Sequence, residues 1–146
     1  MARISFSEQG LTPFEKLLGH NKMILEKWFS LEECFSNSKT FTPELKEEVR
    51  RTLAFNNGCE YCKAKGNPSD DITNSKVLAA TKIADLVSKK RLIDNHEFNS
   101  LKKEFNDQEI SELFALICFL TASQRFGALL DLQPSCSINS SSQINN

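Results

Sequence analysis

Apolar residues recur at helical spacing along most of the chain, and this constrains the fold more than any other feature. Between residues 21 and 35 they lie at offsets of four, seven and eleven, at Ile24, Trp28, Leu31 and Phe35. Such offsets place the side chains on one side of a helix. The chain also has 17 leucines but only 3 valines, a composition typical of helices rather than strands. We therefore predict an all-α fold.

Helix-start and helix-stop signals divide this pattern into separate helices. Thr42-Pro43-Glu44 is typical of a helix start, because threonine caps the first turn and proline fits the first helical position. Gly58 suits a left-handed cap at the end of that helix, and a short helix is expected over residues 59–65. Asn106 with Glu109 resembles a capping box, which predicts the start of the last and most apolar helix.

The length of 146 residues fits one core and is short for two. We predict a single helical domain of about six helices over residues 1–132. Residues 133–146 are mostly Ser, Asn and Gln, which cannot bury enough apolar surface to order a chain. We therefore expect a flexible polar tail there.

The charge balance and the length of the apolar runs argue against binding to nucleic acid or to a membrane. The chain has 18 basic and 19 acidic residues, a formal net charge of −1, and so no excess positive charge for nucleic acid or an anionic membrane. The longest strongly apolar run, Leu113 to Ala122, is too short to cross a bilayer, and the first residues lack the apolar stretch of a secretory signal. These features predict a soluble, cytoplasmic protein with no nucleic-acid or membrane partner.

The segment Cys59-Glu60-Tyr61-Cys62 is the clearest candidate for chemistry. Two cysteines three residues apart at a helix start lie on the same side of its first turn, close enough to form a disulfide after modest adjustment. The positive end of the helix dipole favours thiolates, and Lys63 and Lys65 add to this while Glu60 opposes it. A thiolate can reduce a peroxide and become a sulfenic acid, with which the neighbouring thiol condenses to a disulfide.

The residues alone leave other interpretations of this pair open. Zinc needs about four ligands, and the others would have to come from residues without paired spacing, namely His20, Cys34, His96, Cys118 and Cys136. A thioredoxin-type site belongs to a β-α-β framework, and no strand pattern precedes the pair. Two ordinary buried cysteines are a further alternative, although the nearby lysines disfavour it.

The remaining cysteines point to a reducing environment rather than to further chemistry. Five cysteines without a secretory signal predict no structural disulfide framework. Cys34 and Cys118 have apolar helical neighbours and are expected to be inert core thiols, whereas Cys136 would be an incidental thiol in the tail. The sequence has no glycine-rich phosphate loop or other cofactor motif, so neither a cofactor nor a metal is predicted.

A third residue belongs with the two cysteines. Glu47 lies on the preceding predicted helix, twelve residues before Cys59. The frame formed by Glu47, Cys59 and Cys62 resembles the alkylhydroperoxidase-D-like branch of the carboxymuconolactone decarboxylase family. Other similar positions are Pro43-Glu44-Leu45, Ala54, Asn57-Gly58, Phe105-Asn106-Asp107-Gln108-Glu109-Ile110 and Arg125. The resemblance covers residues 10–132.

This resemblance implies a subunit of a homo-trimer or homo-hexamer that acts as an antioxidant thiol-dependent peroxidase or disulfide reductase. It implies that Cys62 is the attacking sulfur, that Cys59 is the resolving sulfur and that Glu47 is the base or proton-relay carboxylate. The substrate would be a hydroperoxide or a disulfide. An external dithiol would reduce the pair again, and in similar proteins a lipoyl-bearing protein can supply it. The alternative interpretation of Glu47 is a solvated charge beside Glu48.

One position departs from the family pattern, which has a histidine four residues after the second cysteine, where this chain has Gly66. Glycine has no side chain to pass protons, so we expect weaker peroxide turnover than a complete relay would give, with disulfide exchange better preserved. His20 or His96 could fold into the vacant position, although nothing in their spacing indicates it. Two other functions stay open: a non-catalytic redox or metal sensor, and decarboxylation of a muconolactone, for which a redox pair would be superfluous.

Overall fold

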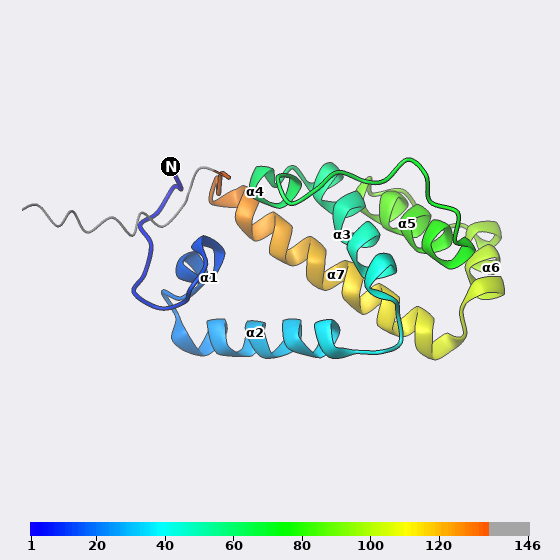
Figure 1. Ribbon diagram of the computed structural model, residues 1–146, viewed down its shortest axis with the longest axis horizontal. Helices are drawn as coiled ribbons and strands as arrows, with labels where there is room; N and C mark the ends of the chain where they lie inside the picture. Colours follow the sequence, from blue (N-terminus) through cyan, green and yellow to red (C-terminus); the bar gives the residue numbers. More distant parts are fainter. Residues whose placement is uncertain (135–146) are drawn as a thin grey trace, which may run out of the picture.

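The computed structural model describes residues 1–134, and this part of the chain forms seven helices and no strand. The helices are α1 (Pro13–Leu18), α2 (Lys22–Asn37), α3 (Pro43–Asn57), α4 (Glu60–Lys63), α5 (Ser75–Ser88), α6 (Asn95–Glu104) and α7 (Asp107–Leu129). Figure 1 shows α7 running diagonally through the molecule, with α3, α4 and α5 on one side and α2 on the other. The prediction of a single all-α domain is confirmed. Most of the predicted tail lies outside the described residues.

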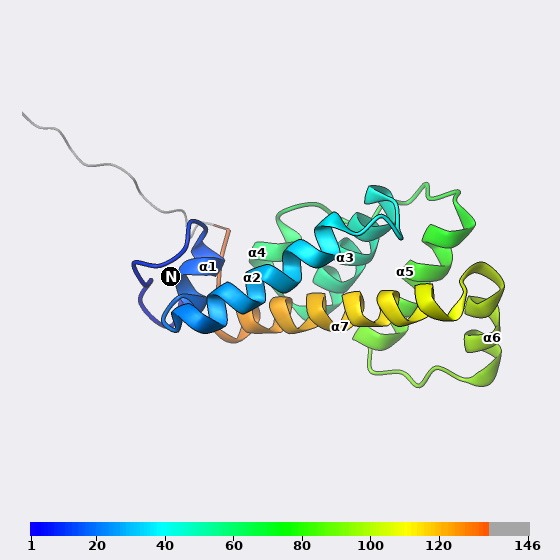
Figure 2. The ribbon, with the colours of Figure 1, turned by 90° about the horizontal axis from the view of Figure 1, so that it is seen from below.

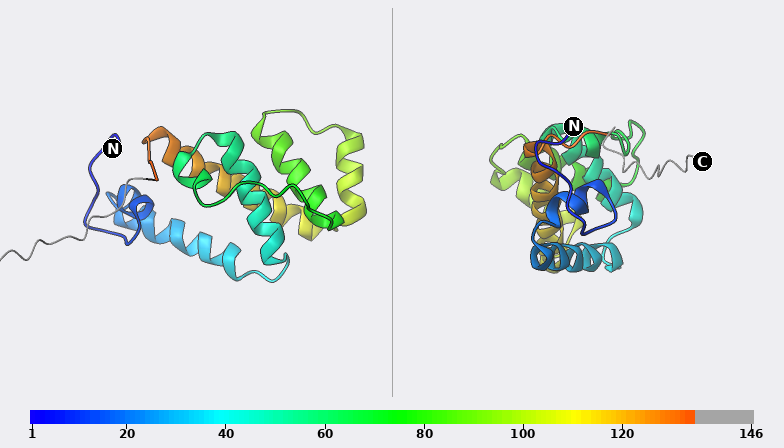
Figure 3. Two further views of the ribbon diagram at one scale, coloured as in Figure 1. Left: turned by 45° about the horizontal axis from the view of Figure 1, so that its top comes forward. Right: turned by 90° about the vertical axis from the view of Figure 1, so that its left-hand side faces the viewer.

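The main core lies where α3, α5 and α7 pack together, and Figure 3 shows α5 and α6 at the end of the molecule opposite to α1. Leu53 of α3, Val77 of α5 and Leu113 of α7 are almost completely buried in it. Each such side chain contributes about 1.5–3 kcal/mol relative to an exposed one. This core fixes α3 against α7, and these two helices carry the residues around the cysteine pair.

A smaller apolar cluster joins the two ends of the described chain next to α4. It contains Ala2, Leu17 and Leu132, with Phe14, Tyr61, Phe126 and Leu130 packed around them. The backbone N–H of Arg3 donates to the carbonyl of Leu130 at 2.9 Å. The N-terminal segment, α1, α4 and the end of α7 are therefore held together around the cysteine segment.

Helix α2 lies along α7 but buries none of its residues completely (Figure 2). Trp28 of α2 contacts Phe119 of α7, with ring centroids 5.7 Å apart, and donates a hydrogen bond to Ser123 Oγ at 3.2 Å. The apolar side chains of α2 that remain exposed are Met23, Ile24, Phe29 and Leu31. Assembly into trimers or hexamers, which would cover such a surface, stays a prediction.

The helix-boundary predictions are confirmed where caps mark them. Thr42 accepts the N–H of Leu45, Gly58 adopts the left-handed conformation with φ 72°, and Asn106 forms a capping box with Glu109. The described residues form seven helices where about six were predicted, and the additional helix is α1. Its start at Thr12 carries the same threonine–proline signal, with a capping box completed by Glu15. The short helix predicted at residues 59–65 is limited to Glu60–Lys63, because Cys59 is its cap.

Helix α7 is, by length and composition alone, long and apolar enough to cross a membrane. The sequence argument considered only the unbroken apolar run Leu113 to Ala122, whereas the whole helix has 23 residues. In the described fold, however, α3, α4, α5 and α6 all contact α7. A core helix meets the same criteria of length and composition, so they are weak evidence for a membrane span.

Candidate active site

Cys59 and Cys62 are joined by a disulfide, with their Cα atoms 5.2 Å apart. The left-handed Gly58 ends α3 and turns the chain, so that α4 begins two residues later. Cys59 caps α4, and its Sγ accepts the backbone N–H of Cys62 at 3.2 Å. The sequence prediction that this pair can form a disulfide is confirmed.

The two sulfurs differ in their access to solvent. Cys59 is fully buried at 0% exposure, whereas Cys62 is half-buried. Gly127 of α7 allows this burial, because a Cβ atom at that position would lie only 3.1 Å from Cys59 Sγ. A molecule that enters from solvent therefore meets Cys62 rather than Cys59.

Cys62 lines a cavity of about 170 Å³ formed by residues of α1, α2, α3, α4 and α7 and of the segment after α4. A cavity of about 150 Å³ is enough for benzene, so this one suits a small molecule. The lining combines apolar and charged groups. It consists of Thr12, Phe14, Glu15, Glu32, Arg50, Tyr61, Cys62, Lys65, Phe119, Leu120, Ser123 and Gln124.

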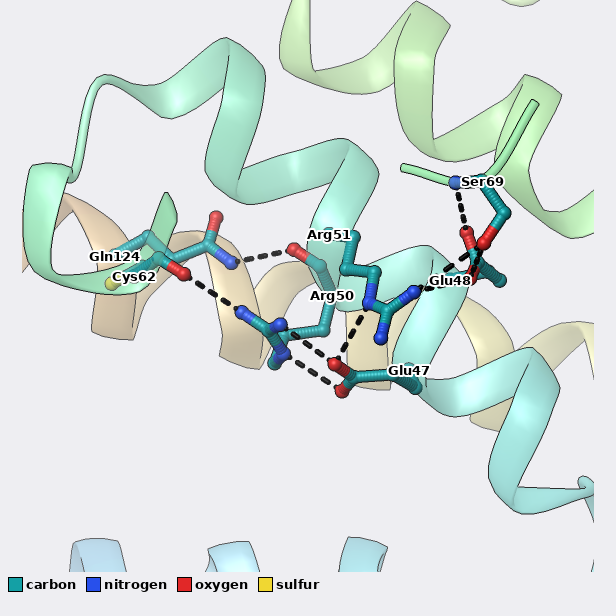
Figure 4. Close-up of polar contacts among 7 residues, drawn as sticks. All are labelled: Glu47, Glu48, Arg50, Arg51, Cys62, Ser69 and Gln124. Carbon is teal, nitrogen blue, oxygen red and sulfur yellow. Dashed lines mark hydrogen bonds and ion pairs between the residues drawn. The ribbon is translucent and has the colours of Figure 1, made fainter. Parts of the chain in front are cut away.

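Glu47 is held by two arginines and not by the cysteines (Figure 4). Its two oxygens accept from Arg50 Nη2 at 2.7 Å and Nε at 2.8 Å, and Arg51 Nε donates to it at 3.0 Å. These arginines, through the hydrogen bonds from Arg50 above all, lower the pKa of Glu47. Its side chain is 40% exposed and lines a neighbouring cavity instead of the one that contains Cys62.

Arg50 connects this ion pair to the cysteine segment. Its Nη1 donates to the carbonyl oxygen of Cys62 at 3.0 Å, while its Nε and Nη2 donate to Glu47. In Figure 4 the Cys62 sulfur lies on the side of that residue away from Glu47. Glu47 therefore reaches the cysteine segment through a guanidinium group, and its role as a base stays a prediction.

The buried amide of Gln124 fixes the backbone on which Arg50 lies. Its Nε2 donates to the Arg50 carbonyl at 3.1 Å, and its Oε1 accepts from Asn57 Nδ2 at 2.9 Å. Gln124 is only 2% exposed, so both hydrogen bonds are shielded from water. This bridge from α7 sets the position of the end of α3 next to the cysteines.

Gly66, where the family pattern has a histidine, is an unfavourable position for a side chain. Gly66 has a φ of 135°, which side chains rarely adopt, and a Cβ atom there would lie 3.1 Å from Arg51 Nε. Neither histidine of the chain takes this place. His20 Nε2 lies 2.7 Å from the carbonyl of Ser5, and His96 is exposed on α6. The space beside Gly66 is taken by the arginine that also binds Glu47.

A Gly66→Ala variant is expected to be less stable by about 1–3 kcal/mol, because the new Cβ meets both an unfavourable φ and Arg51. The comparison variant is Gly58→Ala, where φ is 72°, in the left-handed region that side chains tolerate better, and where the new Cβ meets no atom within 4 Å. Urea denaturation of both variants measures the difference. Equal losses of unfolding free energy in the two variants would contradict the steric contact with Arg51.

The other described cysteines are not core residues. Cys34 on α2 and Cys118 on α7 are both free and exposed, so the prediction of inert core thiols is wrong. The reason is that α2 buries no residue completely and that Cys118 lies on the outward face of α7. Cys136 lies outside the described residues. Within residues 1–134, no group of three or more His, Cys, Asp or Glu side chains could hold a metal ion.

Three residues that line the Cys62 cavity, Glu32, Arg50 and Gln124, were not predicted from the sequence. Arg50 could have been found, because it lies three residues after Glu47 on the same helix face. Glu32 and Gln124 had no such signal, because each comes to the site from a distant helix through tertiary packing alone.

Comparison with known proteins shows a shared fold. No family model matches the chain, and no curated protein matches it significantly. Among solved structures, the debrominase Bmp8 in its apo form has a TM-score of 0.72 and 20% sequence identity, over 83% of this chain and 76% of that one. A cysteine-to-alanine variant of Bmp8 in complex with 2,3,4-tribromopyrrole gives the same score and identity, over 84% and 76%. At this identity the likeness concerns the fold alone.

Proposed function

We propose that this chain is a thiol oxidoreductase that reduces a small hydroperoxide or disulfide at Cys62. The observation that carries the proposal is the unequal access to one disulfide, with Cys59 buried and Cys62 lining a cavity. The resemblance to the alkylhydroperoxidase-D-like branch of the carboxymuconolactone decarboxylase family supports the same assignment of roles.

The reaction with a hydroperoxide has two steps. The Cys62 thiolate attacks the outer oxygen, the O–O bond breaks, and the products are a sulfenic acid and an alkoxide that takes up a proton to become an alcohol. The Cys59 thiol then attacks the sulfenic sulfur, which releases water and forms the disulfide. An external dithiol, such as a lipoyl group, reduces the disulfide and closes the cycle.

A second candidate is reductive removal of a halogen from a small aromatic molecule. Two observations favour it: the fold is shared with a debrominase, and Phe14, Tyr61 and Phe119 line the cavity beside Cys62. The same two thiols supply the electrons, because an aryl bromide and two thiols give the debrominated ring, a disulfide and hydrogen bromide.

The experiment compares both substrate classes on the reduced protein. One equivalent of an alkyl hydroperoxide, or of 2,3,4-tribromopyrrole, is added, free thiols are alkylated, and peptides are analysed by mass spectrometry. We expect the hydroperoxide to produce a Cys59–Cys62 disulfide, because a small molecule can reach Cys62 and the partner sulfur is already in contact. Released bromide with the same disulfide would instead favour dehalogenation.

Two other results would contradict the proposal. If neither compound oxidises the pair, the cavity does not serve this chemistry. If the disulfide forms but an excess of dihydrolipoamide gives no turnover, the pair acts as a redox sensor and not as a catalyst.

A further inference from the structure

The Cys62 cavity contains a carboxylate that no motif indicated. Glu32 lies on α2, far from the cysteines in sequence, and faces the same cavity as Cys62. Among residues 1–134, two carboxylates line this cavity, those of Glu32 and Glu15. Glu15 is already engaged, because its Oε2 accepts the backbone N–H of Leu11 at 2.6 Å and that of Thr12 at 3.3 Å in the capping box of α1.

Glu32, unlike Glu15, is not bound to other groups of the protein. Within the described part of the chain, its carboxylate accepts no hydrogen bond and forms no ion pair. Glu47 differs in both respects, because two arginines bind it and it faces the neighbouring cavity. Of these carboxylates, Glu32 is the one that is free to exchange a proton with a molecule bound next to Cys62.

We propose that Glu32 is the acid of this cavity, which donates a proton to the oxygen that leaves when Cys62 attacks a hydroperoxide. The proposal rests on the proposed function and extends it to a second catalytic residue. In this step the Cys62 thiolate, the hydroperoxide and the protonated Glu32 become the sulfenic acid, the alcohol and the Glu32 carboxylate. Glu32 regains its proton from solvent before the next turnover.

The electrostatic surroundings support this role. Glu32 keeps much of its surface exposed to solvent, and the partial burial of its carboxyl raises its pKa; Lys65 opposes this rise, and Glu15 adds to it. The other charged group of the cavity is Arg50, and α7 contributes no titratable side chain to the lining. A raised pKa keeps Glu32 protonated to a higher pH than an ordinary carboxyl, as an acid catalyst requires.

The second cavity gives Glu32 a further connection. Glu32 and Arg50 line both cavities, whereas Glu47 and Lys46 line only the second one. Glu32 thus lies at the boundary between the Cys62 cavity and the surface that carries Glu47. This position allows protons to reach it from outside while a substrate occupies the space next to Cys62.

The test compares Glu32→Gln with the matched control Glu33→Gln. Both residues are exposed on α2, but only Glu32 lines the two cavities. Stopped-flow kinetics measures the rate at which cumene hydroperoxide oxidises the reduced protein. Alkylation of Cys62 by iodoacetamide is measured in parallel, because that reaction depends on the thiolate but needs no proton for a leaving oxygen. The ratio of the two rates therefore isolates proton donation.

In the wild type and in Glu33→Gln, this ratio is expected to fall as pH rises through the pKa of Glu32, because the acid loses its proton. In Glu32→Gln we expect a ratio that is independent of pH in that range and lower by about 10²–10⁴-fold at its acid end, the usual contribution of a general acid. A pH dependence like that of the wild type in Glu32→Gln, or an equal loss in Glu33→Gln, would overturn the assignment. If the wild type itself forms no Cys59–Cys62 disulfide, the proposed function fails first, and the assignment fails with it.

Discussion

A Cys62→Ser variant is expected to lose hydroperoxide reduction by roughly 10³-fold or more, because the attacking sulfur alone forms a bond to the substrate oxygen. Serine is not ionised at neutral pH and forms no sulfenic acid. Cys59 cannot replace it, because its side chain is fully buried behind Cys62. The measurement is the initial rate of hydroperoxide loss with excess dithiothreitol, corrected for the reaction of dithiothreitol alone.

The matched control is Cys59→Ser, which keeps the attacking sulfur and removes the resolving one. With no dithiothreitol present, this variant should consume one equivalent of hydroperoxide and then stop at a Cys62 sulfenic acid, which dimedone traps. Cys118→Ser removes an exposed thiol outside the cavity and should retain the wild-type rate. If Cys59→Ser is inactive toward the first equivalent while Cys62→Ser reacts, the two sulfurs have the opposite roles.

Most of the fold could be predicted from the sequence because its helices are marked by local signals. Caps such as Thr42, Gly58 and Asn106 act within one turn, so they are visible in a single sequence, and all three function as predicted. The burial of whole helices could not be predicted in this way. Cys34 has the apolar neighbours of a core residue, but it is exposed, and α2 buries none of its residues completely.

The candidate site shows the same limit. The cysteine pair is local, so its spacing was enough to predict contact between the sulfurs. The spacing of the motif did not show which groups bind Glu47. In the structure its carboxylate is bound by Arg50 and Arg51. Glu32 comes to Cys62 from another helix, and such a meeting depends on how α2 and α7 pack. Sequence spacing within one helix gives no information on that arrangement.

A Glu48→Ala variant is expected to lower the free energy of unfolding by about 1–3 kcal/mol, the usual cost of leaving a buried hydrogen-bonding group without its partner. Glu48 is 4% exposed, and its carboxylate accepts from Ser69 N at 3.0 Å, from Ser69 Oγ at 2.6 Å and from Arg51 Nη1 at 2.9 Å. Alanine would leave the backbone N–H and the hydroxyl of Ser69 without this acceptor and would weaken the attachment of the segment between α4 and α5 to α3, where, of the hydrogen bonds to Ser69, only the 3.3 Å bond from Arg51 Nη1 to Ser69 Oγ would be kept. Chemical denaturation followed by circular dichroism measures the loss, and Glu44→Ala, on an exposed part of α3, should cost less than about 1 kcal/mol.

The pH dependence of stability distinguishes the contribution of the negative charge of Glu48 from that of its hydrogen bonds. Burial by itself would raise the pKa of Glu48, but the hydrogen bonds from Ser69 and the charge of Arg51 outweigh it, so the pKa lies below the ordinary 4.5. A carboxyl with a lowered pKa stabilises the fold fully above its unfolded pKa, and this stability is lost as the pH falls through the folded value. We therefore expect Glu48→Gln, which cannot ionise, to lose less stability than the wild type on acidification below about pH 4.5. An equal loss in both proteins would mean that the ionised form of Glu48 does not stabilise the fold, and that its hydrogen bonds to the segment around Ser69 are equally strong without the charge.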